Sequence, residues 1–191
     1  MSSLKADFNE LLARIRQGRA FAHASFEPIF YLVFHPSQLL EVKRQTPAWM
    51  AKLRNEGFEV TLFSIAEHVT DILSKAPLRQ VWLAADAKHP LDWTKTSQSL
   101  ANALVKGDAL QSRLEAVLTG LEGSENTLLL VTDLEALHPY LRIGAIEAQL
   151  QGKFHVPTVF LYPGVRTGKT RLKFLGFYPE DGNYRSVHVG G

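Results

Sequence analysis

The predicted fold starts from an apolar run that ends in a carboxylate, LLLVTD at residues 128–133. We predict a strand over residues 127–132 that delivers Asp133 to its carboxyl end. This placement is typical of nucleotide-binding α/β sheets, in which ligands lie beyond the carboxyl ends of parallel strands. A helical pattern follows over residues 139–151, and a second apolar strand over residues 156–162. A strand, a helix and a strand in this order indicate a βαβ unit and a parallel sheet.

The first third of the chain has the same rhythm. Residues 29–34, IFYLVF, are too uniformly apolar for a half-exposed strand and indicate a central strand covered on both faces. A helix is expected over residues 38–56, broken near Pro47 because proline lacks a backbone N–H. The next strand is expected over residues 58–63, and Ser64 can cap the helix that follows it.

The middle of the chain and its N-terminus are less regular. Residues 81–83 fit either a strand or a helix, and residues 97–121 predict a helix interrupted near Gly107. Apolar residues at helical spacing predict an amphipathic helix over residues 4–18, with Gly18 as its stop. The apolar face of that helix must cover the sheet or a partner, and we expect it to pack in the core.

Two shorter strands are expected near the C-terminus, at residues 171–174 and 184–189, where they would run antiparallel at the sheet edge. We therefore predict a single α/β domain over residues 1–191. Its mainly parallel sheet is flanked by helices, P-loop-like or Rossmann-like but degenerate, with a short C-terminal antiparallel edge. Residues 1–20 carry the amphipathic helix, and residues 127–191 are the most distinctive segment.

Composition narrows the class of protein. The chain has 191 residues, 46% of them hydrophobic and 21% charged, which is ordinary for a soluble globular protein. Its net charge of +2 is too small to indicate nucleic-acid binding by itself. The absence of cysteine excludes disulfides and thiolate metal sites. No apolar stretch approaches the roughly 18 residues that a membrane span needs, so we expect a cytoplasmic protein without a membrane contact.

The triplet Gly168-Lys169-Thr170 matches only the end of a phosphate-binding P-loop. That motif needs a glycine five positions before Gly168, between a strand and a helix, and Pro163 stands there. Residues 171–175 alternate like a strand, so a turn between two strands is the better prediction.

The usual position of a P-loop, after the first strand, has the sequence FHPSQ at residues 34–38. Without glycine, backbone amides cannot wrap a triphosphate closely, and no lysine is present to neutralise it. We therefore expect neither ATP hydrolysis nor a bound cofactor.

Asp133 and Glu135 stand where nucleotide hydrolases place a magnesium-binding carboxylate. Alternatively, Thr132 or Asp133 caps the next helical turn or makes a structural hydrogen bond. We favour the cap or structural bond, and leave metal or partner binding open.

His138 and Arg142 are four residues apart and would share one face of a helix. Arg142 would then pair with Asp133 or Glu135, or reach an acidic group of a partner. The seven histidines have no local metal-ligand spacing, so no metal site is predicted.

The C-terminal segment holds an aromatic and a guanidinium group side by side. Tyr184 and Arg185 have the composition of protein interfaces, although they could also stack on nucleotides. Asn183 belongs to a turn, and Ser186 and His188 share a face of the predicted strand without a further catalytic partner. We assign no catalytic residue. The candidate partner-binding or structural polar residues are Asp133, Glu135, His138, Arg142, Asn183, Tyr184 and Arg185.

The chain as a whole resembles the BrxB family of bacteriophage exclusion (BREX) defence systems, and its C-terminal segments are the specific part of that resemblance. The resemblance rests on DLEALHP at residues 133–139 with Arg142, VPTVFLYPG at 156–164, GFY at 176–178, DGNYRS at 181–186 and GG at 190–191. It implies a non-enzymatic component of an anti-phage complex, an adaptor that joins larger partners. The partners it implies are a PglZ-type phosphatase-like protein and an AAA+ ATPase.

Two other functions stay open. The first is a cryptic magnesium-dependent nucleotide hydrolase or nuclease that uses Asp133 and Glu135. The second is a subunit that binds DNA directly, through basic residues at positions 43, 44, 166, 169, 171 and 173.

Overall fold

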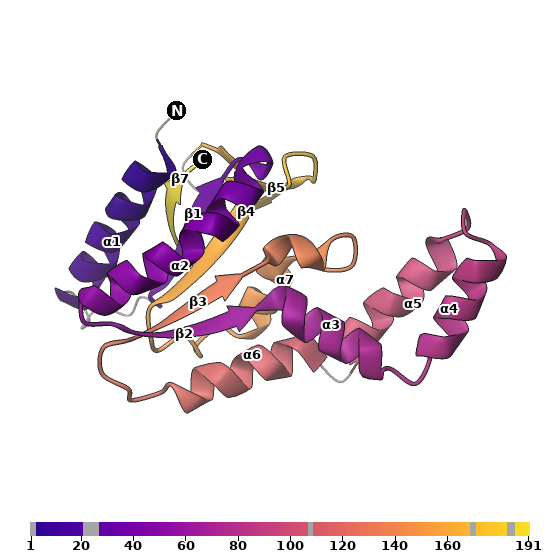
Figure 1. The fold of residues 1–191 in the computed structure, drawn as a ribbon. Helices are drawn as coiled ribbons and strands as arrows, with labels where there is room; N and C mark the ends of the chain where they lie inside the picture. Colours follow the sequence, from indigo (N-terminus) through magenta and orange to yellow (C-terminus); the bar gives the residue numbers. More distant parts are fainter. Residues whose placement is uncertain (1–2, 21–26, 107–108, 169–170, 183–185) are drawn as a thin grey trace.

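A five-stranded parallel sheet forms the centre of the protein (Figure 1). The computed structural model describes residues 3–20, 27–106, 109–168, 171–182 and 186–191. The strands are β1 (Ile29–Phe34), β2 (Glu59–Ser64), β3 (Thr127–Thr132), β4 (Thr158–Thr167), β5 (Arg171–Phe174), β6 (Glu180–Gly182) and β7 (Val187–Gly190).

Helices connect these strands. They are α1 (Leu4–Ala20), α2 (Leu39–Asn55), α3 (Ile65–Lys75), α4 (Arg79–Lys88), α5 (Thr94–Val105), α6 (Ala109–Gly120) and α7 (Ile143–Gln149), with the 3-10 helices η1 (Pro36–Gln38) and η3 (Leu134–Leu137).

The sheet has the order β2-β3-β4-β1-β7, and each neighbouring pair is parallel. The far half of β4 continues as an antiparallel partner of β5, which in turn pairs with β6. The predicted fold class, a mainly parallel α/β sheet with a short antiparallel edge, is therefore confirmed. One detail was wrong: β7 runs parallel to β1, with Val187 opposite Phe30, and does not belong to the antiparallel edge.

Both faces of β1 are covered, which explains its uniform apolarity. Successive strand residues point to opposite faces. Phe30, Leu32 and Phe34 pack in a core with α1 and α2. Ile29, Tyr31 and Val33 pack in a second core beneath α3, α6 and α7. Figure 1 shows α1 and α2 on one side of the sheet and α6 on the other.

The N-terminal helix packs in the core, as predicted. Phe8, Leu11, Leu12 and Ile15 are only 1–4% exposed, and the Phe8 ring stacks on Trp49 of α2 at 4.8 Å between centroids. Gly18 does not end this helix, which continues to Ala20.

Two helix predictions were inaccurate, and one open alternative is settled. Helix α2 runs unbroken through Pro47, and the Thr46 hydroxyl donates a 2.8 Å hydrogen bond to the Val42 carbonyl within it. The helix predicted over residues 139–151 begins only at Ile143, because a turn separates it from η3. The ambiguous residues 81–83 are helical and belong to α4.

The predicted cap and the predicted interruption were correct. The Ser64 hydroxyl oxygen accepts a 3.3 Å hydrogen bond from the Glu67 N–H at the start of α3. The helical stretch 97–121 is divided between α5 and α6. Helices α4 and α5 form a hairpin that projects from the sheet, at the right of Figure 1.

Candidate functional site

Asp133 lies at the carboxyl end of β3, where the sequence predicts it, and joins three elements. Its carboxylate accepts hydrogen bonds from the Lys43 ammonium at 2.6 Å, the Thr132 hydroxyl at 2.7 Å and the Ser64 hydroxyl at 2.8 Å. The residue has φ of 61°, and its side chain makes no cap bond to η3. The structural hydrogen bonds are therefore confirmed, whereas the helix cap was wrong.

Lys43 of α2 bridges both predicted carboxylates, since its ammonium also lies 2.7 Å from Glu135. Burial alone would raise the pKa of Asp133, but the bonds from Lys43, Thr132 and Ser64 outweigh it and lower that pKa. For Lys43, burial lowers the pKa, and the hydrogen bonds to Asp133 and Glu135 reverse this into a net rise. Lys43 and Asp133 thus hold each other in their charged forms.

A cavity of about 300 Å³ lies between α2 and the sheet beside this Lys43–Asp133–Glu135 cluster. Its wall is mostly apolar, with Phe34, Met50 and Leu161 among the residues that line it. The segment after β1 does not offer its amides to this space as a glycine loop would. Instead, the His35 ring accepts a hydrogen bond from the Ser37 N–H, and the Gln38 side chain accepts one from the His35 N–H.

Arg142 lies away from the carboxylates that we expected it to pair with. Its guanidinium stacks on the Tyr178 ring, with 3.2 Å between Cζ and the ring centroid, and lies 5.9 Å from the Phe174 ring centre. His138 hydrogen-bonds the Tyr178 hydroxyl and packs edge-on against Phe177. The shared helical face was wrong, because α7 begins after Arg142. The pairing of Arg142 with Asp133 or Glu135 was also wrong, since its guanidinium packs on aromatic rings, whereas contact with an acidic group of a partner stays a prediction.

The structure thus divides the predicted site. Asp133 and Glu135 belong to the Lys43 cluster, and His138 and Arg142 belong to an aromatic cluster around Tyr178. Asn183, Tyr184 and Arg185 lie outside the described residues. Gly168 follows the end of β4, which pairs antiparallel with β5, whereas Lys169 and Thr170 of the triplet also lie outside the described residues.

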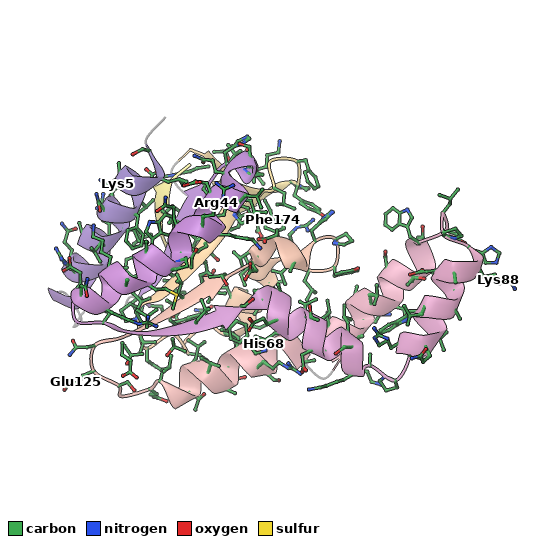
Figure 2. The ribbon with its side chains drawn as sticks, viewed as in Figure 1. Lys5, Arg44, His68, Lys88, Glu125 and Phe174 are labelled. Carbon is green, nitrogen blue, oxygen red and sulfur yellow. The ribbon has the colours of Figure 1, made fainter. Side chains whose placement is uncertain are left out.

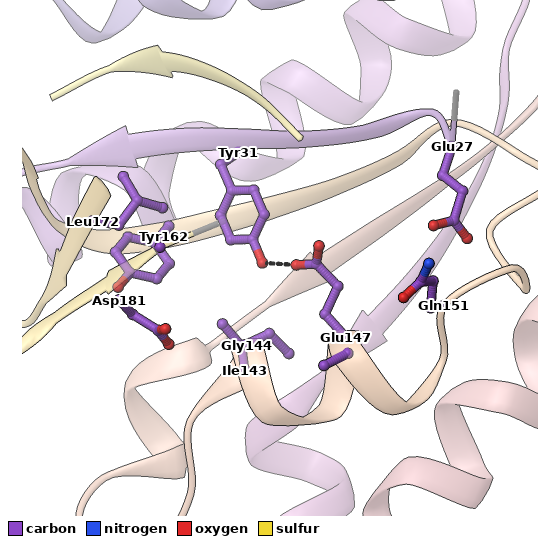
Figure 3. Close-up of a pocket in the computed structure, with 11 residues that line it drawn as sticks. Glu27, Tyr31, Ile143, Gly144, Glu147, Gln151, Tyr162, Leu172 and Asp181 are labelled. Atoms are coloured by element: carbon purple, nitrogen blue, oxygen red, sulfur yellow. Dashed lines mark hydrogen bonds between the residues drawn. The ribbon is translucent and has the colours of Figure 1, made fainter. Parts of the chain in front are cut away.

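Sequence reasoning missed a second pocket, which lies between α7 and the sheet and has a volume of about 210 Å³ (Figure 3). Inside it the Tyr31 hydroxyl hydrogen-bonds the Glu147 carboxylate. Both residues are buried, with exposed fractions of 1% for Tyr31 and 8% for Glu147. Burial raises the pKa of Tyr162, whose ring lies edge-on to Tyr31 at 5.6 Å between centroids, and the nearby Asp181 raises it further. The available signal was a glutamate on the apolar face of the helical pattern 139–151.

His188 of β7 packs edge-on against Tyr31, with ring centroids 5.4 Å apart. Its Nε2 lies 2.9 Å from the Ser186 hydroxyl. Burial and the neighbouring Arg166 guanidinium lower the pKa of His188 to about 4. The imidazole is therefore neutral at physiological pH.

The described residues contain neither a metal-binding cluster nor a membrane-spanning helix. No group of three or more His, Asp or Glu side chains in this part of the chain is placed to hold a metal ion. Within the same residues, no helix combines the length and the apolarity needed to cross a bilayer.

Comparison with known proteins gave one match. A family model described as "BREX protein BrxB" matches residues 61–189, which is most of the chain. No curated protein and no solved structure matches it.

Proposed function

Because the chain belongs to the BrxB family of BREX defence systems, we propose that it is a non-catalytic adaptor of an anti-phage complex. Its proposed partners are the PglZ-type phosphatase-like protein and the AAA+ ATPase of the same system. The observation that supports the non-catalytic part is the Lys43 bridge, in which one ammonium contacts both carboxylates at the carboxyl end of the sheet.

The bridge opposes magnesium binding at Asp133. A nucleotide hydrolase needs free carboxylate oxygens for the metal and a glycine loop for the phosphates. Here three donors within 2.8 Å satisfy Asp133, and a hydrogen bond to a charged group is worth about 1.5–3 kcal/mol. A metal ion would have to displace the lysine. The segment after β1 supplies no substitute, because side chains cap its own backbone.

The second candidate function is the magnesium-dependent hydrolase or nuclease that uses Asp133 and Glu135. It would require Lys43 to leave both carboxylates when the substrate binds. The substitution Lys43→Met tests it, since freeing the carboxylates would raise magnesium-dependent turnover in such an enzyme. An adaptor has no turnover to raise.

Direct DNA binding has less support. Among the basic residues considered for it, Lys43 pairs with Asp133, Arg44 with Glu41 and Arg171 with Glu180. These pairs cancel much of the charge that phosphate contacts would need.

Co-purification from cells that express the intact defence system tests the adaptor. We expect an affinity-tagged chain to retain the phosphatase-like protein, the ATPase or both. The isolated chain should hydrolyse neither ATP nor DNA with magnesium. Loss of both partners in a folded, tagged chain would contradict the proposal.

The substitutions Tyr184→Ala and Arg185→Ala test whether the C-terminal segment binds a partner. If this segment anchors an interface, we expect a loss of about 1–3 kcal/mol in the free energy of binding.

A further inference from the structure

The α4–α5 hairpin is built to stand apart from the sheet. Figure 2 shows Lys88, at the end of α4, on the far side of the molecule from the sheet. The two helices hold each other through Trp82, which is 7% exposed and donates an indole hydrogen bond of 2.8 Å to Ser99. Its base is fixed by Leu104, which is buried in the core beneath α3 and α6. The hairpin is therefore a preformed projection.

Most of the exposed large apolar side chains of the described residues lie on this projection. Of the nine large hydrophobic residues that are exposed among the described residues, six lie on the hairpin and its flanks: Leu78, Val81, Leu83, Leu91, Trp93 and Val105. Two of them stand at its tip, defined as residues 88–95, where Leu91 is 93% and Trp93 is 62% exposed. Contiguous exposed apolar groups mark interaction sites, and tryptophan is among the commonest anchors of interfaces.

The charge of the hairpin is as distinctive as its apolarity. From Leu78 to Lys106 it carries four cations and two carboxylates, a net charge of +2. The cations are Arg79, Lys88, Lys95 and Lys106. Among the described residues, the ion pairs of the protein all lie elsewhere, so these four cations have no internal counter-ion. Lys88 and Lys95 flank the apolar tip on either side.

We infer that the tip of the α4–α5 hairpin docks into an apolar groove with carboxylates at its rim on a protein partner. The inference rests on the proposed adaptor function and assigns it a surface. Trp93 and Leu91 would fill the groove, and Lys88 and Lys95 would pair with the rim. Charge complementarity of this kind steers association and is weakened by salt, whereas the buried aromatic anchor sets the dissociation rate.

The test measures affinity with defined proteins. Each other protein of the defence system is purified and titrated singly with the full chain by calorimetry. For the partner that binds, we expect Trp93→Ala combined with Leu91→Ser to weaken the dissociation constant at least about 30-fold. Lys88→Glu combined with Lys95→Glu should weaken it about tenfold and reduce its salt dependence. All four positions are exposed, so the variants should keep the wild-type melting temperature.

Matched controls separate the tip from a general loss of surface. Leu40 is 66% exposed on α2, and Lys5 is an exposed cation of α1. Leu40→Ser and Lys5→Glu should leave the dissociation constant within about twofold of wild type. An equal loss in these controls would overturn the inference.

The remaining outcomes distinguish this inference from the function on which it rests. Wild-type chain that binds none of the purified proteins contradicts the adaptor itself. Tight wild-type binding that the tip variants leave unchanged overturns only the hairpin assignment. So would tip-dependent dimerisation in light scattering, tip-dependent sedimentation with phosphatidylglycerol vesicles, or tip-dependent binding of a DNA duplex in place of a protein.

Discussion

Asp133 carries more of the predicted chemistry than any other residue, and its role is measurable. Replacing it with Asn removes the charge but keeps a side chain that tolerates the positive φ of 61°. We expect Asp133→Asn to lower the free energy of unfolding by about 1–3 kcal/mol in denaturant titrations at pH 7, because Lys43 loses one of two counter-ions. The exposed Asp92→Asn is the control, with a change within about 0.5 kcal/mol.

The same variant has a signature in acid. The net lowering of the Asp133 pKa means that its contribution is present above the ordinary value of 3.8 and is lost as pH falls below it. Between pH 5 and pH 2, the free energy of unfolding should therefore decrease less steeply with falling pH for Asp133→Asn than for wild type. Parallel curves would show that Asp133 is not stabilised as a carboxylate.

His188 gives a second pH prediction. Its pKa of about 4 in the folded protein lies below the ordinary value of 6.5, so the unfolded chain takes up a proton first as pH falls. Stability is therefore lost between pH 6.5 and about 4. Because His188 is partly exposed, we expect this loss of unfolding free energy to be only about 1–2 kcal/mol. The substitution His188→Asn should remove most of this pH-dependent loss.

The control for this experiment is His68. Burial and Arg113 lower the pKa of His68, so protonation of His68 also destabilises the folded protein as pH falls. In His188→Asn the free energy of unfolding should therefore still decrease somewhat over this pH range. If His188→Asn and wild type lose stability equally between pH 7 and 4, His188 is not held neutral.

At the scale of elements, the N-terminal helix is a structural part of the sheet. Phe8 is 3% exposed and stacks on Trp49, and truncation of a buried phenylalanine costs about 3–5 kcal/mol. We expect Phe8→Ala to lose that amount in denaturant unfolding, with Lys5→Ala as the near-neutral control on the same helix. A loss below about 1 kcal/mol would contradict this and would mean that the apolar face of α1 is available to bind a partner.

Local patterns predicted elements well where one force dominates. The spacing of apolar residues placed α1, because burial of a whole stripe exceeds the roughly 1 kcal/mol that Gly18 costs within a helix. Helix α2 shows the same balance. Its proline costs about 3 kcal/mol, but the buried Val42, Trp49 and Leu53 each return about 1.5–3 kcal/mol, so the predicted break does not form.

Patterns failed where the partner lies far along the chain. The direction of β7 depends on its pairing with β1, which its own residues do not encode. The helix expected from residue 139 is shortened because Tyr140 and Leu141 reach the core from a turn, bonding back to the Leu137 carbonyl. The sequence shows that these two residues are apolar, but it does not predict that they lie in a turn.

At the scale of the whole molecule, the same reasoning explains the site. Asp133 and Glu135 were found because they follow a recognisable strand. Lys43 was named only for DNA binding, and its ion pair with these carboxylates was missed because it lies 90 residues away from Asp133 along the chain. The Tyr31–Glu147 pair is separated by 116 residues and could be identified only once the sheet had brought both together. Contacts of this kind follow from topology, which one sequence specifies only indirectly.

The division between a dense sheet and a thin hairpin predicts how the molecule opens. All six residues of β1 are at most 3% exposed, whereas Trp82 and Leu104 are the only large apolar side chains of α4 and α5 that are buried among the described residues. Segments with few buried contacts open at lower free energy than the core. In hydrogen exchange followed by mass spectrometry, we expect amides of α4 and α5 to exchange at least about a hundredfold faster than those of β1. Replacing Trp82 with Phe removes its bond to Ser99 and should accelerate exchange in the hairpin alone. Acceleration that also reached β1 would mean that the hairpin and the sheet unfold as one unit, and that the hairpin is not an independent projection.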